Sequence, residues 1–398
     1  MFSLRRFTVF KGQRPSLLRV ILLCMPLLDE LVSGFLFIGL PLASKQLQLD
    51  YTQIGFLFAA GALSSTVLDP LINLLSDRRA KRPWILAGLL IMVAGIALAA
   101  TTRSFVLLVC AFVVIYPALT TALDLSQAVL VDQNPQESAR TMTRWTIMAN
   151  VGDLLAPIIV SLVIILPGGW STLCWLACGL WLLAAVLIAV QRFPRQEHAD
   201  DDAEEPAVKL LDGLRAALRD PLLLRWVALT ILPTMLDEIF VVYATLYMRD
   251  VLHMHPNLIG LLLTVHMIGA FLGLFVLERT LLQRTAPHRL LIGLALIIII
   301  GMTCFLTLHA LWFTGLALFI IGVGATGLYP IALGQAYKCY PGRSGLVRTV
   351  ISMGAPFEVL LPSVVGLAAG HFGVIASICI LGTAPFLVIL LASQGTTR

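Results

Sequence analysis

Seven carboxylic acids stand inside long apolar stretches of this chain, where an ionised side chain is costly. They are Asp29, Glu30, Asp124, Asp153, Asp237, Glu238 and Glu358. A carboxylate at the centre of a hydrocarbon layer costs roughly 3 kcal/mol, so such a residue normally faces a cavity or a polar partner and marks function. Burial and mutual repulsion both disfavour its charged form. The chemistry that these residues offer is therefore reversible binding of protons or cations.

The apolar stretches around these acids are long enough to cross a membrane. Of the 398 residues, 59% are hydrophobic and only 12% are charged, and the mean hydropathy is +0.94. This composition excludes a soluble multidomain protein, a disordered chain and a disulfide scaffold. A helix needs about 20 residues to cross a bilayer core. We predict twelve spans, with approximate limits 18–43, 52–76, 83–102, 104–130, 143–166, 170–191, 221–247, 257–280, 288–309, 311–337, 346–369 and 372–393.

The basic residues predict the orientation of these spans. With both termini in the cytoplasm, all but three of the 27 Lys and Arg residues fall on the cytoplasmic side, the exceptions being Lys45, Arg103 and Arg249. Cytoplasmic loops of membrane proteins carry such an excess. It explains the net charge of +5 better than nucleic-acid binding does. We expect an integral protein of a bacterial inner membrane, with both termini cytoplasmic.

One polar segment divides the chain into two sets of six spans. Residues 200–205 form an acidic run, which we interpret as a solvated linker, and 208–219 have the pattern of a helix lying on the membrane surface. We therefore predict three parts: an N-terminal six-helix bundle at 1–191, a cytoplasmic linker with an amphipathic helix at 192–220, and a C-terminal six-helix bundle at 221–398.

Short motifs in the first set of spans recur in the second set. Asp29-Glu30 corresponds to Asp237-Glu238, and Arg140-Thr141 corresponds to Arg348-Thr349, both at the same offset along the chain. Matching order and chemistry indicate a duplicated six-span unit in parallel orientation.

The loop after the second span carries a charged motif, Asp77-Arg78-Arg79-Ala80-Lys81-Arg82. It resembles the signature G-x-x-x-D-[RK]-x-G-[RK]-[RK] of the major facilitator superfamily, with Asn73 and Ala80 in place of the glycines. The resemblance implies an all-α membrane protein, with twelve helices in two six-helix bundles related by a pseudo-two-fold axis. It also implies that Asp77, Arg78 and Arg82 form a latch between the bundles. The alternative is that the basic residues only anchor the cytoplasmic side, and we interpret Lys81 as such a membrane-surface anchor.

In that family, spans 1, 4, 7 and 10 line a central cavity. The resemblance therefore makes Asp29, Glu30, Asp124, Asp237 and Glu238 the candidate coupling groups. Neighbouring residues on a helix point about 100° apart, so we expect one acid of each pair to face the cavity. Asp153 and Glu358 each precede a proline and are secondary acids. A coupling role and a hydrogen bond to a carbonyl freed by that proline stay open for both.

Four further residues are candidates for the cavity wall: Tyr243, Tyr247, Tyr329 and Gln335. They are amphipathic enough to contact an organic solute, and they could equally be core or interface residues. No Lys or Arg stands deep inside a predicted span. We therefore expect an acidic cavity, suited to protons, Na⁺ and cationic or neutral solutes rather than to anions.

These features predict a secondary active transporter that works by alternating access, with H⁺ as the coupling ion and Na⁺ as the alternative. Gly152-x-x-x-Ala156-Pro157 is similar to the G-x-x-x-G-P motif of the family's exporters, which favours efflux of hydrophobic or cationic compounds. Asp69-Pro70 is similar to the branch of cation–sugar symporters, which favours uptake of a neutral solute such as a sugar. A membrane sensor or scaffold that transports nothing is the alternative from another class.

Sequence motifs of other chemistries are missing. The chain has no phosphate-binding loop, no H-E-x-x-H and no nucleophile elbow, which argues against an ATP-driven pump or a membrane enzyme. We expect no cofactor, no metal and no nucleic-acid partner. The partners are a small-molecule substrate, a coupling ion and the lipid bilayer, and the expected oligomeric state is a monomer.

Overall fold

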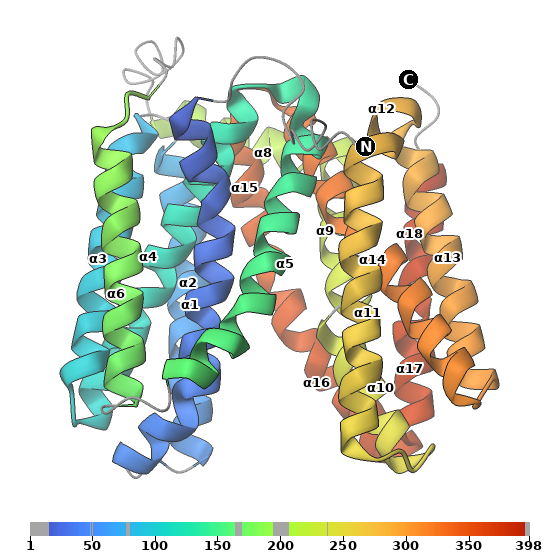
Figure 1. The fold of residues 1–398 in the computed structure, drawn as a ribbon. Coiled ribbons are helices and arrows are strands. Elements are labelled where there is room, and N and C mark those ends of the chain that lie inside the picture. Colours follow the sequence, from blue (N-terminus) through green and yellow to red (C-terminus); the bar gives the residue numbers. More distant parts are fainter. Residues whose placement is uncertain are drawn as a thin grey trace, which may run out of the picture.

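A computed structural model describes residues 16–47, 49, 51–76, 80–163, 169–193, 207–236 and 238–394. All the secondary structure in these residues is helical (Figure 1). The N-terminal bundle contains α1 (Leu17–Leu47), α2 (Tyr51–Ser76), α3 (Lys81–Thr101), α4 (Phe105–Asp132), the 3₁₀ turn Pro135–Glu137, α5 (Ser138–Val163) and α6 (Trp170–Val190).

The linker supplies α8 (Ala207–Ala217). The C-terminal bundle contains α9 (Pro221–Leu236), α10 (Glu238–Asp250), α11 (Pro256–Val276), a π-helical turn (Leu277–Leu281), α12 (Leu282–Arg284), α13 (Pro287–Thr307), α14 (Leu311–Cys339), α15 (Ser344–Ser352), α16 (Ala355–Phe372), α17 (Val374–Leu381) and α18 (Thr383–Ser393).

The described helices match the predicted membrane spans. Within the residues that the structure describes, nine helical stretches are long and apolar enough to cross a membrane. The other predicted spans correspond to α1, α5 and the pair α15–α16, which carry charged side chains such as Asp29, Asp153 and Arg348.

The eleventh predicted span is not one continuous helix. It is divided at Met353-Gly354 into the short α15 and the longer α16. The position of a Cβ atom on Gly354 would lie 2.6 Å from Cδ1 of Ile231 on α9, so a larger residue here would have to displace the end of that side chain. The break makes α15 a separate nine-residue helix.

Each bundle has a hydrophobic core of its own. The N-terminal core is built around buried side chains such as Trp181, Phe35 and Phe112, and the C-terminal core around Phe240, Tyr247 and Phe305. The C-terminal core also takes in Leu74, Val131 and Met142 of the N-terminal bundle, so apolar packing continues across the interface where the bundles meet.

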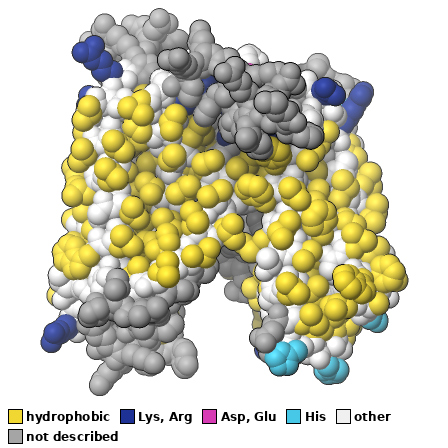
Figure 2. Space-filling view, in the orientation of Figure 1, with side chains coloured by type: hydrophobic (Ala, Val, Ile, Leu, Met, Phe, Trp, Pro, Cys, Tyr) yellow, Lys and Arg dark blue, Asp and Glu magenta, His cyan; other side chains and the backbone are white. Residues whose placement is uncertain are grey.

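The two bundles meet at one end of the molecule and separate at the other (Figure 1). We call the first the termini end, because α1 begins there and α18 ends there, and the second the open end. Hydrophobic side chains cover the middle of the surface, and a hollow separates the bundles at the open end (Figure 2). The contacts that hold the bundles together at the termini end form the candidate site.

Candidate functional site

The short helix α15 carries C-terminal side chains into the N-terminal bundle. It packs against α2 and α4, and the Thr349 hydroxyl donates a hydrogen bond to the Pro70 carbonyl oxygen of α2 at 3.2 Å. Because α15 is separated from α16 by the break at Met353-Gly354, its angle is set by these contacts as well as by its own bundle.

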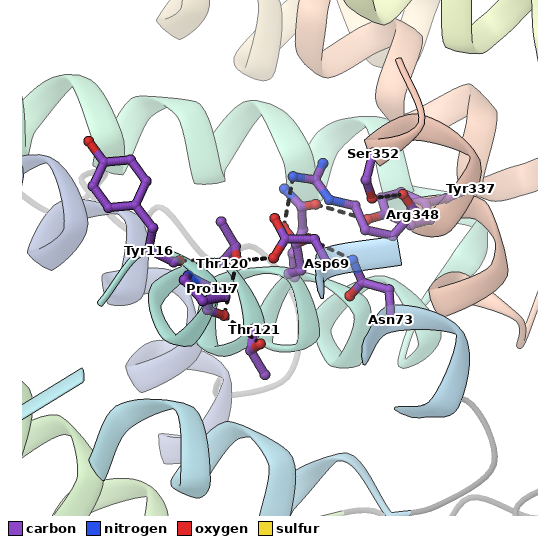
Figure 3. A network of polar contacts seen from close by, with 11 residues as sticks. Asp69, Asn73, Tyr116, Pro117, Thr120, Thr121, Tyr337, Arg348 and Ser352 are labelled. Atoms are coloured by element: carbon purple, nitrogen blue, oxygen red, sulfur yellow. Dashed lines mark hydrogen bonds and ion pairs between the residues drawn. The ribbon is translucent and has the colours of Figure 1, made fainter. Parts of the chain in front are cut away.

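An ion pair joins the two bundles at the centre of this contact. Nη2 of Arg348 on α15 lies 2.7 Å from Oδ1 of Asp124 on α4. The other oxygen of Asp124 accepts a hydrogen bond from the Asn73 side-chain amide at 3.0 Å. Both oxygens of Asp124 thus have a partner. The residue is 5% exposed, so water has little access to it. Figure 3 shows Arg348 reaching toward the α2 and α4 side chains.

This ion pair corrects one expectation. The sequence pattern assigned Arg348 to the cytoplasmic edge and predicted an interior without basic residues. The structure instead places the half-buried Arg348 side chain between the bundles, because α15 packs against α2 and α4 and its guanidinium meets Asp124 there. The interior contains a counter-charge for Asp124.

A second carboxylate, which the sequence did not single out as a site residue, lies one turn along α2. Asp69 accepts a hydrogen bond from the Thr120 hydroxyl at 2.7 Å, and it lies within electrostatic range of Asp124 and Arg348 (Figure 3). Asp69 and Asn73 are four residues apart on α2, and their partners Thr120 and Asp124 are four apart on α4. Residues at this spacing share a helix face, and that matched spacing was the signal that could have identified Asp69.

Helices α1 and α5 add two of the predicted acids to this group. Asp29 on α1 lies within electrostatic range of Asp153 and Asp124, and the Ser33 hydroxyl donates to its carboxylate at 3.4 Å. Glu30 differs from its neighbour: its Cβ lies 2.9 Å from the position that a Cβ on Gly152 of α5 would occupy. Asp29 is therefore the acid that reaches the group, while Glu30 lies where α1 crosses α5.

We name Asp29, Asp69, Asp124 and Asp153, together with Arg348, the acid cluster. Within the described part of the chain, it brings four carboxylates from four helices of one bundle together with one guanidinium from the other. Asp29 and Asp69 accept hydrogen bonds from Ser33 and Thr120 but have no ion pair among the described residues, so exclusion of water would favour uptake of protons or cations by these two carboxylates.

Two further groups of side-chain hydrogen bonds cross the interface at the termini end, one around Lys81 and one at Tyr337. Lys81 at the start of α3 donates to Asp132 at 2.5 Å and to the Ser344 hydroxyl of α15 at 2.6 Å. That hydroxyl donates to Asp132 at 2.8 Å. The Tyr337 hydroxyl donates to the Gln127 side-chain oxygen at 2.8 Å, also across the interface.

The opposite side of the interface is closed by Glu278. The π-helical turn that ends α11 places its carboxylate against α5, where Oε1 accepts from Nε of Arg140 at 2.8 Å and lies 2.8 Å from Nη2 of Arg144. Arg140 and Arg348, which the sequence paired as equivalents in the two halves, each reach a carboxylate of the opposite bundle.

The remaining predicted residues differ in their position. Tyr247 is 1% exposed in the C-terminal core, where its ring centroid lies 5.2 Å from that of Phe305, and Tyr243 belongs to the same core. Tyr329 lies within electrostatic range of Arg348, and the Gln335 side-chain nitrogen is buried without a partner in the described residues. Asp77, Arg78 and Asp237, and the side chains of Glu238 and Glu358, lie outside the described residues.

The predicted latch residue Arg82 and its neighbour Lys81 make different contacts. Arg82 donates to the Ala189 carbonyl oxygen, which belongs to its own bundle. Lys81, which the sequence interpreted as a surface anchor, is 3% exposed and bonds across the interface to Ser344. A buried position beside Asp132 accounts for the difference, because an ammonium group is retained there only with charged and polar partners.

From these contacts we predict that substitutions of Lys81 and Arg82 have different effects on the closed termini end. Lys81→Gln should loosen the termini end and expose α15, because the bond to Ser344 is lost. Arg82→Gln should leave α15 protected. Hydrogen–deuterium exchange of the α15 amides measures both; equal exchange in the two variants would contradict a closing role for Lys81.

Small residues set the spacing of α1 and α5. The position of a Cβ on Gly152 would lie 2.4 Å from the Leu27 carbonyl oxygen, and that of a Cβ on Gly34 would lie 2.3 Å from Cβ of Ala156. The Gly152-x-x-x-Ala156 motif thus lets the backbones of α5 and α1 come into direct contact, as small residues do at helix crossings in membranes.

Comparison with known proteins gives one family and a consistent fold. A family model described as the Major Facilitator Superfamily matches residues 22–355. The fosmidomycin resistance protein of Escherichia coli (strain K12) is 24% identical over 173 residues, which span 43% of this chain and 42% of that protein. The chain thus matches less than half of the length of this relative.

Solved structures of membrane transporters share the fold. The E. coli fucose:proton symporter FucP superposes with a TM-score of 0.81 at 18% identity, covering 96% of this chain and 98% of that one. The human organic anion transporter MFSD10 gives a TM-score of 0.71 at 17% identity, covering 95% and 100%. A bacterial homologue of the iron transporter ferroportin, in an outward-facing state, gives 0.75 at 13%, covering 96% and 100%. Likeness at this identity concerns the fold alone.

Proposed function

Since the chain belongs to the Major Facilitator Superfamily, we propose that it is a proton-driven transporter that moves a small organic solute by alternating access between its two bundles. The termini end is cytoplasmic in this proposal, because nearly all basic residues fall on that side. The structure is then an outward-facing state, closed toward the cytoplasm.

The acid cluster is the observation that carries the proposal. Arg348 neutralises Asp124 in this state, and Asp69 and Asp29 add charges that no described basic residue pairs with. Closing the open end would bury these charges in a site without water, at a cost of several kcal/mol each unless protons bind first. Protonation from the open end therefore permits closure, which is the requirement for coupling.

Release on the other side follows from the same contacts. When α15 moves away from α2 and α4, Arg348 leaves Asp124 and water enters from the cytoplasm. The hydrated carboxylates then lose their protons. Because Arg348 comes from one bundle and the acids from the other, each rocking movement changes the electrostatic environment of the acids.

Export of hydrophobic or cationic compounds is the direction that we propose. A carboxylate excess attracts cations, and the α1–α5 contact is built on the motif that is similar to that of exporters. The name of the matched relative, a fosmidomycin resistance protein, agrees with handling of a foreign compound. Cation-coupled uptake of a neutral solute is the second candidate, favoured by the oxygen atoms that Asp69 and Thr120 bring together.

The coupling prediction is tested with purified protein in liposomes that contain a pH-sensitive dye. A panel of cationic drugs, sugars and amino acids is first screened for stabilisation against heat. Addition of a stabilising compound should then move protons across the membrane. Asp69→Asn should abolish that proton movement, because the amide retains the hydrogen bond to Thr120 but cannot take up the proton.

The control is Asp212→Asn on α8, where the carboxylate is exposed and paired only with Arg215. Its proton flux should equal that of the wild type. Replacing the proton gradient with a sodium gradient identifies the ion. Transport at an unchanged rate in Asp69→Asn, with no flux of either ion in the wild type, would refute the coupling and leave a uniporter.

A further inference from the structure

The short helix α15 is enclosed by helices from three parts of the chain. Seven of its nine residues are buried. It packs against α2 and α4 of the N-terminal bundle, against α9 and α14 of the C-terminal bundle, and against α8 of the linker. The helices α8 and α15 lie beside each other at the termini end (Figure 1). The linker therefore contributes to the surroundings of the helix that carries Arg348.

The apolar face of α8 is turned toward the protein. Ala217 is fully buried in the C-terminal core, and Leu214, almost one turn earlier, packs against the same core. Arg215, on the other face, is exposed. The position of a Cβ atom on Gly213 would lie 3.9 Å from Nη1 of Arg343, the residue that precedes α15. The amphipathic pattern that predicts a membrane-surface helix thus serves, in these residues, to seat α8 on its own chain.

Asp220 fixes the end of α8 to two other helices. The residues 218–220 alone separate α8 from α9. Oδ1 of Asp220 accepts a hydrogen bond from the backbone N–H of Leu222 at 2.9 Å and so caps the start of α9. Oδ2 accepts one from the hydroxyl of Tyr340, at the end of α14, at 3.2 Å. One carboxylate thus sets the position of α8 relative to both α9 and α14.

We propose that α8 is a strap that holds α15 to the C-terminal bundle. A helix of nine residues is not stable in water by itself, so α15 depends on the helices that cover it. With α8 in place, α15 moves with the C-terminal bundle, and separation of the bundles draws Arg348 away from Asp124. This use of the strap rests on the proposed alternating access, whereas the packing of α8 on α15 does not.

Release of the strap has a local effect that can be measured without transport. When α8 leaves its seat, α15 loses part of its cover, and the free energy of opening its hydrogen bonds falls. The amides of α15 should then exchange faster with deuterium. The amides of α16, which continues the same predicted span, are the internal reference because α16 does not depend on the strap.

The first test compares neighbouring substitutions in the purified full-length protein. Ala217→Glu places a charge at a fully buried position. It should release α8 and raise exchange of the α15 amides about tenfold or more, because an unpaired charge is costly to bury. Ala216→Glu introduces the same side chain at an exposed position of α8. It is the matched control and should leave the exchange of α15 as in the wild type.

A second variant has the opposite expected sign. Gly213→Ala should strengthen α8, because alanine is favoured over glycine inside a helix by about fivefold in equilibrium terms, and its Cβ would make an ordinary contact with Arg343. Exchange of α15 should slow by up to about fivefold, which a loss of folding cannot imitate. Gly293→Ala on α13, where a Cβ would have no described atom within 4 Å, is the control.

Two results would overturn the strap. One is unchanged exchange of α15 in Gly213→Ala, which decides alone if Ala217→Glu does not fold. The other is an equal rise in Ala216→Glu and Ala217→Glu. Because no step measures transport or proton movement, failure of the strap and failure of the proposed coupling are separate outcomes.

Discussion

Gly334→Ala should open the termini end and stop transport. The position of a Cβ on Gly334 of α14 would lie 2.3 Å from Cα of Ala139 on α5, and the Ser138 hydroxyl donates to the Gly334 carbonyl at 2.6 Å. The methyl group would meet backbone, which cannot turn aside. Overpacking of this kind costs about 1–3 kcal/mol, which shifts the ratio of two conformations by about 5- to 150-fold.

The distance between spin labels on Gln136 and Gln283 measures this shift. Both side chains are exposed at the termini end, one in each bundle, and the seven native cysteines are first replaced. The labels should move apart in Gly334→Ala. Gly293→Ala on α13 is the control, because a Cβ there meets no atom within 4 Å. An unchanged distance in Gly334→Ala would show that the crossing of α5 and α14 does not hold this end closed.

Arg348→Gln should destabilise the protein strongly, and Asp124→Asn added to it should restore most of the loss. Removing Arg348 leaves the Asp124 carboxylate buried, with the Asn73 amide as its remaining partner among the described residues. Breaking a buried ion pair from one side costs about 3–5 kcal/mol, whereas replacing both partners is often neutral. Thermal unfolding in detergent measures both variants.

The exposed pair Arg215–Asp212 on α8 is the matched control for this cycle. Its atoms are 3.7 Å apart and its side chains are 74% and 62% exposed. Such a pair contributes about 0–1 kcal/mol, so Arg215→Gln should leave the unfolding temperature almost unchanged. If Arg348→Gln unfolds at the wild-type temperature too, Asp124 does not depend on the ion pair in this state.

The fold could be predicted because its signals lie within single helices. Twelve apolar blocks, the position of the polar segment and the Asp77–Arg82 motif need no knowledge of distant contacts, and hydrocarbon imposes helices on any chain that crosses it. The acids Asp29, Asp124 and Asp153 were found for the same reason, because a carboxylate in an apolar block is unusual by itself.

The partners of these acids could not be predicted, since they depend on contacts between bundles. Nothing near Arg348 in the sequence shows that its side chain will lie against Asp124, and Lys81 resembles any other residue of a basic loop. Asp69 is an intermediate example. The spacing of Asp69 and Asn73 matches that of Thr120 and Asp124, but the match becomes visible only when α2 and α4 are known to be neighbours in register.

The break at Met353-Gly354 has a mechanical consequence. A continuous helix would transmit every displacement of α15 to α16 over its whole length, and one bundle would have to rock as a rigid body. Met353 and Gly354 both keep right-handed helical dihedral angles, so the interruption is slight, but it divides the span into two helices. We expect the chain to bend more easily here than within α15 or α16, so that a displacement of α15 with Arg348, Ser344 and Thr349 need not carry the whole of α16 with it. Opening of the termini end would then be a step distinct from reorientation of the bundles.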